Sequence, residues 1–503
     1  MDIFLLLLLP IFTLISACAS LQVLVHFQMP EDEGFKNSWI CKIAFILSLT
    51  LSGAITMLLP IDVKNAAENG GLNMEIVWPA AFILMMVFAL VVNPLAMLLY
   101  ETEGDVAMHP RRRLRAMLIQ GTILTLGLVA IIGVTYLVFS KASIPCDTID
   151  EKPTPAPCKD NRSGVYRTKT AFHIYTIAVV SFIGWFLFAI FGAIPYMLIR
   201  AFMRRPPSAI RDADYRNHRE VLARAASSLQ VKSEKLKREE AKLDTLREFR
   251  KKRKEASLKR DFNKFKADVH MLEDAFSHAH SAVNRTRGEN SSLIRVGKLA
   301  LGIISIILSI LWLLHVALFM LARKKGTEDP VSPMLNWLLT DFVHSDSLFI
   351  VTFLLFGLLV FYLQAATITG CITFGTKLFF IIPVHLLRSG DTPLNSLLFN
   401  ASLILLSTAA TVHFATIALA DYTKQSVAWR MFATEVHYLD FYRFFFDNKI
   451  FLYMMIISSV IGFMMLTVNG RVKRTSLYVD KSAEKRIREL ASSASGQDDE
   501  GCS

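Results

Sequence analysis

The polar side chains of this sequence that could exchange a proton or bind a ligand lie inside long apolar segments. Histidine exchanges a proton near neutral pH, and His315 and His413 lie inside these segments. Buried histidines usually pack against neighbours, and buried amides and hydroxyls usually link helices by hydrogen bonds. The alternative is that these side chains line a cavity for a solute or a lipid. The candidate cavity-lining residues are Asn93, His315, Gln364, Thr367, Asn395, Asn400 and His413.

The sequence contains no pattern typical of an active site or of a cofactor or metal site. Residues 370–377 resemble a phosphate-binding loop, but Thr376 and Lys377 stand in the wrong order and the segment leaves an apolar helix rather than a strand. The scattered cysteines lack the spacing of metal ligands; they are Cys18, Cys41, Cys371 and Cys502. We therefore predict that the protein is not an enzyme and has no catalytic residue, cofactor or metal site.

The apolar segments predict an integral membrane protein. Hydrophobic residues make up 53% of the 503 residues and the mean hydropathy is +0.41. A helix needs about 20 apolar residues to cross roughly 30 Å of hydrocarbon. We predict an all-α fold, a polytopic transmembrane bundle of about nine spans. The blocks are residues 3–27, 43–59, 76–100, 116–139, 171–199, 296–321, 348–374, 394–420 and 450–468. Asp62 follows the second block, and we expect it to mark the water boundary.

The first block also resembles a signal sequence. Residues 17–19 are small enough for a cleavage site, and residues 15–18 resemble a bacterial lipoprotein box. Both kinds of signal need a basic region before the apolar stretch, and here only Met1 and Asp2 precede it. The apolar run also continues to Phe27, so we favour an uncleaved first span.

Basic clusters at the ends of the blocks predict the orientation. Clusters lie at residues 111–115, 200–205, 287–298 and 471–474, and alternation of the spans places all four on one side. The positive-inside rule makes that side cytosolic, so we predict a luminal N-terminus and a cytosolic C-terminus. The cluster at 323–325 opposes this orientation, and the short loops alone carry similar numbers of basic residues on both sides.

The predicted luminal loop 140–170 offers weak support for this orientation. Its Cys146 and Cys158 are a candidate disulfide in an oxidising lumen. Asn161 begins the sequon Asn-Arg-Ser and is a candidate glycosylation site. Sequons also begin at Asn284 and Asn290 in the predicted cytosolic loop, so this signal is not specific.

The predicted cytosolic loop 203–292 is rich in Lys and Arg. The net charge of +12 is compatible with nucleic-acid binding, but a basic loop between spans favours contact with anionic lipid headgroups, and we expect no nucleic-acid partner. Apolar residues recur at three-, four- and seven-residue steps from Tyr215 to Leu246 and again from Leu258 to Phe276. This stripe predicts a hairpin of two antiparallel helices that docks a partner or a second copy. A single solvated helix is the alternative.

These patterns divide the chain into four parts. Residues 1–200 carry spans one to five, 203–292 the basic helical hairpin, 293–470 spans six to nine, and 471–503 a cytosolic tail.

Several separated segments carry a family resemblance. They are residues 27–32, 57–62, 100–101, 194–206, 332–336 and 395–400. In order and spacing they resemble the limb-region-1-like (LMBR1-like) membrane proteins, and most of all the plant and protist branch. That family includes the lipocalin-interacting membrane receptor and the lysosomal cobalamin transport escort protein. The resemblance implies nine spans, a luminal N-terminus and a coiled cytosolic loop between spans five and six.

The resemblance also implies a function by association. The expected role is that of a receptor, or of an escort or accessory of a transporter, in a lysosomal or other endomembrane or in the plasma membrane. Expected partners are membrane lipids, a membrane protein or a second copy bound through the hairpin, and a small-molecule or lipocalin ligand. Two alternatives remain: a solute transporter or channel in its own right, and a lipid scramblase or other lipid-handling protein.

Overall fold

The computed structural model divides the 503-residue chain into two compact units. The membrane unit comprises Met1–Ala201 with Gly302–Val468, and the basic unit comprises Phe202–Leu301 with Asn469–Ser503. The structure describes residues 3–29, 32, 38–67, 71–103, 110–146, 164–192, 199, 212–243, 258, 261–262, 264–277, 279, 292–322, 329–342, 349–378, 387, 392–468 and 481–498.

The membrane unit is built from long apolar helices, several of which continue into a π-helical turn. The long helices are α1 (Ile3–Phe27), α2 (Trp39–Ala67), α3 (Met74–Val87), α4 (Asn93–Glu103), α5 (Pro110–Phe139), α7 (Phe172–Leu187), α11 (Ser292–His315), α13 (Phe349–Leu378), α14 (Leu394–Ala418) and α18 (Ile450–Val468). The π-helical segments are η2 (Phe88–Val92), η4 (Phe188–Gly192), η5 (Val316–Leu321), η6 (Leu338–Phe342) and η8 (Arg430–Val436). Shorter elements are α12 (Leu335–Trp337), α15 (Ala420–Thr423), α16 (Val427–Trp429), α17 (Asp440–Asp447) and strands β1 (Lys141–Pro145) and β2 (Val165–Lys169).

These helices confirm the predicted membrane bundle. Among the described residues, eight helices are long and apolar enough to span a membrane, and α17 with α18, bent by 47°, makes a ninth if the pair is one span. A helix satisfies its backbone hydrogen bonds internally, which is what a chain in hydrocarbon requires. The apolar blocks of the sequence therefore became helices at nearly the expected positions.

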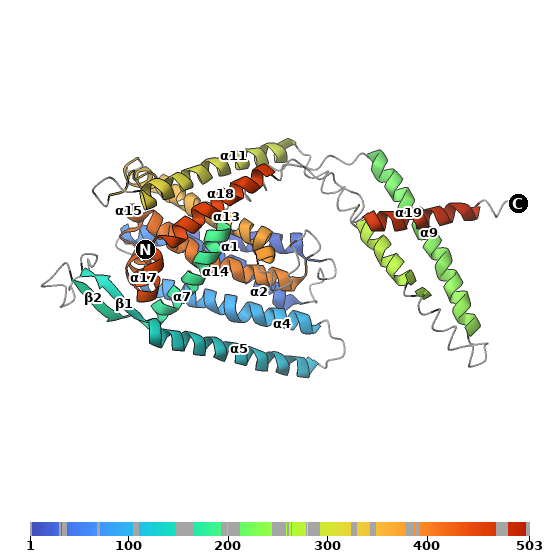
Figure 1. Ribbon diagram of the computed structural model, residues 1–503, viewed down its shortest axis with the longest axis horizontal. Coiled ribbons are helices and arrows are strands. Elements are labelled where there is room, and N and C mark those ends of the chain that lie inside the picture. The colour runs from blue at the N-terminus through green and yellow to red at the C-terminus, as the bar shows by residue number, and fades with distance from the viewer. Residues whose placement is uncertain are drawn as a thin grey trace. The chain divides into compact units, whose positions relative to one another are not determined.

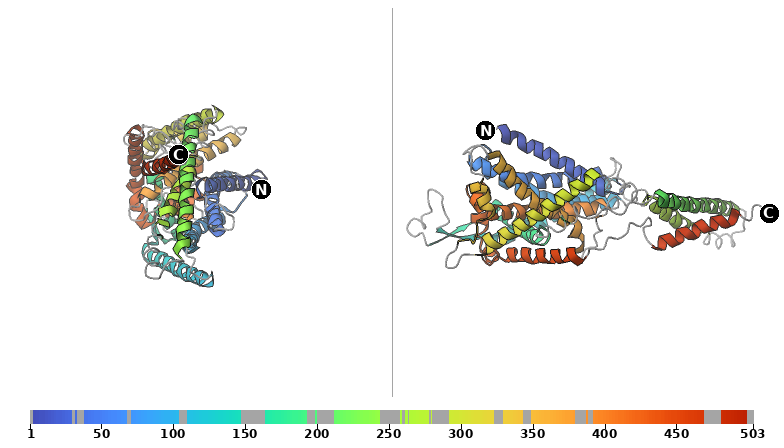
Figure 2. Two further views of the ribbon diagram at one scale, coloured as in Figure 1. Left: turned by 90° about the vertical axis from the view of Figure 1, so that its right-hand side faces the viewer. Right: turned by 90° about the horizontal axis from the view of Figure 1, so that it is seen from above.

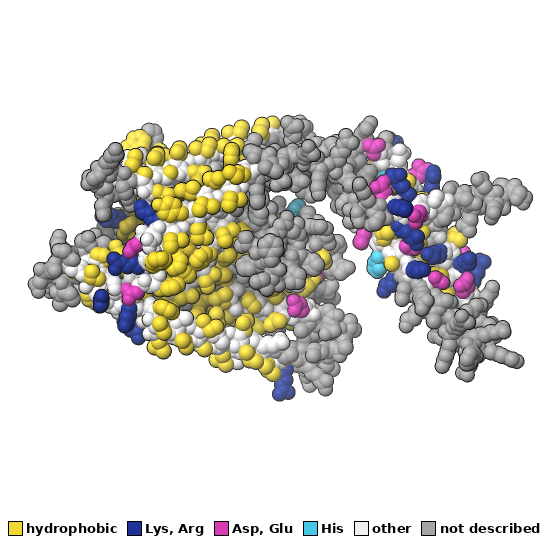
Figure 3. Space-filling model, viewed as in Figure 1, with side chains coloured by type: hydrophobic (Ala, Val, Ile, Leu, Met, Phe, Trp, Pro, Cys, Tyr) yellow, Lys and Arg dark blue, Asp and Glu magenta, His cyan; other side chains and the backbone are white. Residues whose placement is uncertain are grey.

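Helix α14 is the centre of the membrane unit (Figures 1 and 2). It packs against α2, α4, α7 and α13, and its side chains are almost all buried. By contrast, α5 lies at the edge, where Ile123, Leu126 and Leu137 are 65%, 63% and 74% exposed. Figure 3 shows a broad hydrophobic surface over this unit. Such a surface is an aggregation hazard in water but a normal lipid-facing surface in a bilayer.

One end of the membrane unit carries the two strands, and we call it the strand end. β1 and β2 pair antiparallel, with Lys141 opposite Lys169, and Ala142 forms an isolated bridge with Leu439. The start of α1 lies at this end as well (Figure 1). At the other end, which we call the Asp32 end, Gln28 bridges Thr392. The connections that the alternating spans place on one side of the membrane thus contact each other. Which of the two ends faces the cytosol stays a prediction.

The basic unit has its own hydrophobic core. Helix α9 (Asp212–Leu243) contributes Leu222, Ala225 and Leu229, and the helical residues 264–277 contribute Ala275, with Phe265, Val269 and Leu272 packed against it. All of these residues except Ala275 belong to the predicted stripe. The connection between the two segments lies outside the described residues, so the hairpin stays a prediction.

The C-terminal segment differs from the separate tail that the sequence suggested. Helix α19 (Lys481–Asp498) adds Ile487, Leu490 and Ala491 to the core of the basic unit. These residues recur at three- and four-residue steps, so they face one side of α19. A stripe that short in a charged segment carries little sequence signal, and it was overlooked for that reason.

Candidate functional site

Gln364 is the centre of a polar cluster inside the membrane unit. Its Nε2 on α13 donates to Ser52 Oγ of α2 at 2.8 Å and to Thr408 Oγ1 of α14 at 2.9 Å. The two hydroxyl oxygens lie 2.8 Å apart and share a further hydrogen bond. All three side chains are buried, and the contacts join three spans. Sequence analysis missed Ser52 and Thr408; the steps of four from Ser48 to Ser52 and Thr56 were a usable signal.

Asn93 connects α4 to α2 and α14, nearer the Asp32 end. Its Oδ1 accepts from Ser48 Oγ at 3.0 Å, and its Nδ2 donates to Ser402 Oγ at 3.1 Å. Asn93 directly follows the π-helical segment η2 and precedes Pro94. Proline has no N–H and clashes with the preceding turn, which is one cause of such irregularities. The bulge and the amide together fix α4 against α2 and α14.

Three other candidates bond within their own helices. Thr367 Oγ1 donates to the carbonyl of Leu363 at 2.8 Å, and Asn400 Nδ2 donates to the carbonyl of Ser396 at 2.8 Å. Asn395 Oδ1 accepts from the amide of Ser396 at 2.7 Å, at the start of α14. These contacts are local, and they leave Asn400 Oδ1 buried without a hydrogen-bond partner among the described residues.

His413 of α14 is fully buried among aromatic side chains. Its Nδ1 accepts from Trp185 Nε1 at 3.0 Å and lies 2.9 Å from Ser181 Oγ. Because an indole N–H can only donate, a neutral ring carries its proton on Nε2. Phe432 stacks on the imidazole, with centroids 4.5 Å apart. The buried Nε2 has no hydrogen-bond partner among the described residues.

His315 joins α11 to the end of α14. Its Nε2 lies 2.7 Å from the carbonyl oxygen of Ala418, and its Nδ1 accepts from the amide of Leu335 at 3.4 Å. Asn336 Nδ2 donates to the same carbonyl at 3.3 Å, and Phe319 stacks on the ring. Both ring nitrogens are engaged, so this histidine holds structure together.

Asp62 is not at the water boundary, which corrects our expectation. The side chain is fully buried. Its Oδ2 accepts from Trp78 Nε1 at 2.8 Å and from the amide of Ala428 at 2.7 Å, and its Oδ1 accepts from the amide of Val427 at 3.3 Å. A carboxylate at the first amides of α16 is stabilised as an N-terminal helix cap. The error arose because the folded connection between α14 and α18 covers the end of α2.

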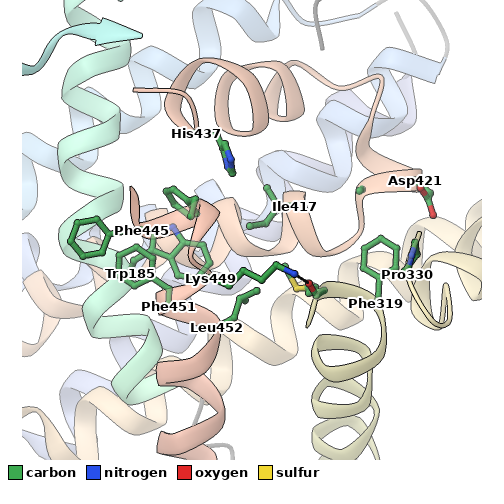
Figure 4. Close-up of a pocket in the computed structure, with 13 residues that line it drawn as sticks. Trp185, Phe319, Pro330, Ile417, Asp421, His437, Phe445, Lys449, Phe451 and Leu452 are labelled. Carbon is green, nitrogen blue, oxygen red and sulfur yellow. Dashed lines mark hydrogen bonds between the residues drawn. The ribbon is translucent and has the colours of Figure 1, made fainter. Parts of the chain in front are cut away.

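The described residues form a cavity of about 510 Å³ at the strand end. This volume is within the range of small-molecule sites. The lining residues, ten of which are labelled in Figure 4, are Trp185, Phe319, Met320, Pro330, Ile417, Ala420, Asp421, His437, Phe445, Phe446, Lys449, Phe451 and Leu452. None of the seven candidates lines this cavity. That they line another one stays a prediction.

Lys449, His437 and Asp421 are the charged or titratable residues that line the cavity. Lys449 Nζ donates to the carbonyl oxygens of Met320 and Leu321 at 2.9 and 3.4 Å, which caps η5. His437 Nε2 lies 3.3 Å from Asp447 Oδ1. Burial lowers the pKa of His437, Asp447 opposes that shift, and Arg443 adds to it, so His437 is mainly neutral at pH 7. Sequence analysis missed the cavity because its residues come from several spans and from the connections between them. The aromatic run at 441–446 was the available signal.

The remaining predicted sites are only partly described. Cys146 is disulfide-bonded, whereas Cys158 and Asn161 lie outside the described residues. In the part of the chain that the structure describes, no group of three or more His, Cys, Asp or Glu side chains is placed to hold a metal ion.

Comparison with known proteins decides the family. The model of the LMBR1-like membrane protein family matches residues 1–292, more than half of the chain. The chain belongs to this family. It is 27% identical over 502 residues to an LIMR family protein of Dictyostelium discoideum, covering 90% of this chain and 94% of the relative. An LIMR family protein of Arabidopsis thaliana is 26% identical over 472 residues, covering 86% and 89%. No solved structure matches.

Segments that carried the resemblance meet at the Asp32 end of this LMBR1-like chain. Tyr100 Oη donates to Asp32 Oδ2 at 3.0 Å, and Lys42 Nζ donates to the backbone carbonyl of Asp32. The amide of Thr392, just before α14, donates to the carbonyl of Phe27 at 3.1 Å. The family segments 27–32 and 100–101 thus meet here, and Lys42 and Thr392 add contacts from two further spans.

Proposed function

We propose that this LMBR1-like protein is a membrane receptor or transporter accessory that acts by binding a partner through its basic unit. The observation that carries the proposal is the separate core formed by α9, residues 264–277 and α19. A unit with its own core presents a defined surface, and binding energy is then not consumed by ordering a flexible loop. Within the membrane unit, Gln364 and Asn93 link helices rather than line the cavity, which favours association over conduction.

The exposed face of α9 is suited to an acidic partner surface. Arg219, Lys235 and Arg238 are exposed there, while the buried stripe faces the core. Charge complementarity gives such contacts specificity and fast association. The proposal covers the two roles implied by the family resemblance: a receptor for lipocalin-type ligands and an escort of a cobalamin transporter. It also includes a location in a lysosomal or plasma membrane, with the basic unit in the cytosol.

The test is charge reversal on the exposed face of α9. Full-length chain carrying Arg219→Glu, Lys235→Glu and Arg238→Glu would be compared with wild type by crosslinking and mass spectrometry in native membranes. We expect loss of the crosslinked membrane-protein partner, with membrane insertion unchanged. Surface substitutions are preferable to deletion of α9, since deletion would remove the core residues against which Ile487 and Leu490 pack.

A matched control reverses charge at the strand end. Lys141→Glu with Arg167→Glu changes exposed charges on β1 and β2 and should leave the partner bound. If the α9 variant retained its partner, or if both variants lost it equally, the proposal would be wrong.

A solute transporter or channel is the second candidate, and one observation favours it. The carbonyl oxygens Gln364 Oε1 and Asn400 Oδ1 are buried without a hydrogen-bond partner among the described residues, and such oxygens can replace the hydration of a permeating species. In liposomes, Gln364→Leu and Asn400→Leu should then slow solute flux, while Thr411→Val, which removes a bond within α14, should not. The same vesicles with a fluorescent lipid test the scramblase alternative. Absence of flux under every imposed gradient would exclude transport.

A further inference from the structure

The cavity at the strand end lies beside the break between α17 and α18. Lys449 is at this break and immediately precedes α18. Trp185 of α7, which is fully buried, stacks on Phe451 of α18 with ring centroids 5.1 Å apart. The cavity therefore has a charged group, Lys449, close to an apolar wall in the interior of the bundle.

The helical elements η5 and α18 line the cavity, and α18 also has an exposed outer face. Phe319 and Met320 of η5 line one side, and Phe451 and Leu452 of α18 line another (Figure 4). On α18, Leu452 is 8% exposed and points into the cavity, whereas its neighbour Tyr453 is 54% exposed on the outer surface. One helix thus separates the cavity from the surrounding bilayer.

The wall chemistry sets the class of ligand. Five aromatic side chains and several aliphatic ones make the wall apolar, which suits a hydrocarbon chain. Lys449 supplies a positive charge on a partly buried side chain. His437 is mainly neutral, and the carboxylate of Asp421 is exposed, so water and salt screen its charge. The wall thus combines a cationic group with apolar side chains.

We propose that this cavity binds a single-chain lipid with an anionic head, taken from the bilayer, with the head at Lys449 and the chain along Phe451 and Leu452 toward Trp185. The binding energy comes from burying the chain and from a charge-assisted hydrogen bond to the ammonium group. This site is in the membrane unit and is independent of a partner at the basic unit.

The test is photolabelling of the full-length chain in nanodiscs of phosphatidylcholine. The probe is palmitic acid that carries a diazirine near the end of its chain. We expect labelled peptides around residues 445–452 and 319–320. Excess palmitate should compete for the label and hexadecanol, which has the same chain without the charge, should not. Equal competition by hexadecanol, or labelling confined to other spans, would overturn the proposal.

Three variants test the mode of binding. Leu452→Trp fills the cavity, and Lys449→Gln removes the charge while keeping N–H donors for the end of η5. Each should lower labelling about tenfold, the effect of losing one good contact to a charged or buried group. Tyr453→Trp places the same bulk on the outer face of α18 and should leave labelling unchanged. If Leu452→Trp and Tyr453→Trp labelled alike, the lipid would be on the outside. If Leu452→Trp did not fold, the competition in wild type would still decide.

Discussion

The Asp62 carboxylate accepts the amide proton of Ala428 at 2.7 Å, although 366 positions separate the two residues. This contact and the one from Val427 attach the end of α2 to the beginning of α16 and η8. Since η8 carries Phe432, which stacks on His413, and leads to His437 of the cavity wall, Asp62 indirectly positions the strand end of the bundle.

Replacing Asp62 should destabilise the strand end. Asp62→Ala leaves two amides and the Trp78 indole buried without an acceptor, and we expect a loss of about 3 kcal/mol of unfolding free energy. Asp62→Asn keeps one acceptor oxygen and should lose less. Thermal unfolding of the purified chain in detergent measures both. Glu75→Gln is the matched control, because it removes an exposed ion pair to Arg430 on the same segment and exposed pairs contribute at most about 1 kcal/mol. Equal melting temperatures for Asp62→Ala and Glu75→Gln would contradict the proposed role.

The closest approach of α7 to α14 depends on Gly184. A Cβ built at Gly184 would lie 2.2 Å from the carbonyl oxygen of Leu406, which is backbone. Gly184→Ala must therefore separate the helices, at a cost of about 1–3 kcal/mol, and disturb the Trp185 to His413 hydrogen bond beside it. Gly127→Ala meets nothing within 4 Å and should be neutral or slightly stabilising. Melting temperature and tryptophan fluorescence report both effects; a Gly184→Ala variant as stable as Gly127→Ala would refute the close contact.

The C-terminal helix should be required for the basic unit to stay folded. Ile487 is fully buried in the core with Leu222 and Ala225, so Ile487→Ser should cost about 2–4 kcal/mol. Hydrogen exchange of the full-length chain should then accelerate throughout α9, while α14 is unchanged. Lys485→Ser, on the exposed side of α19, is the control. Unaltered protection of α9 in Ile487→Ser would mean that α19 does not contribute to the core.

Asp268 should make the stability of the basic unit depend on acidic pH. Burial raises the pKa of its carboxyl, but the hydrogen bonds and charges of Arg486 and Lys232 outweigh burial and hold the pKa below its ordinary value. A depressed folded-state pKa means that the carboxylate contributes stability above the unfolded-state pKa, near 4, and loses it as the pH falls through the folded-state value. The hydrogen-exchange protection of α9 should therefore fall as the pH is lowered from 5 to 3, for the same reason that proteins unfold in acid. Asp268→Asn should be less protected at pH 5 and lose less on acidification; an identical pH profile would exclude Asp268 as the cause.

The spans were predictable because the signal is local. A segment of about 20 apolar residues enters hydrocarbon as a helix whatever its neighbours are, and the nine apolar blocks match the helices for that reason. The stripe from Leu222 to Leu229 was also visible, since heptad spacing puts such residues on one face of a helix.

Pairings between distant residues were not predictable in the same way. Gln364 was a candidate by its type, but its partners Ser52 and Thr408 follow from which helices lie side by side, which no local pattern specifies. Asp62 looked like a boundary residue because its cap, the amides of Val427 and Ala428, comes from a connection far along the chain.

By itself the sequence determined that this protein lies in a membrane, roughly where its spans begin and end, and to which family it belongs, because apolar length and motif order can be found along a single chain. Only the tertiary structure decided that α19 completes the basic unit and that a cavity opens beside Lys449. Both depend on surfaces assembled from separate segments, and side-chain packing sets the distances between them only in the folded bundle.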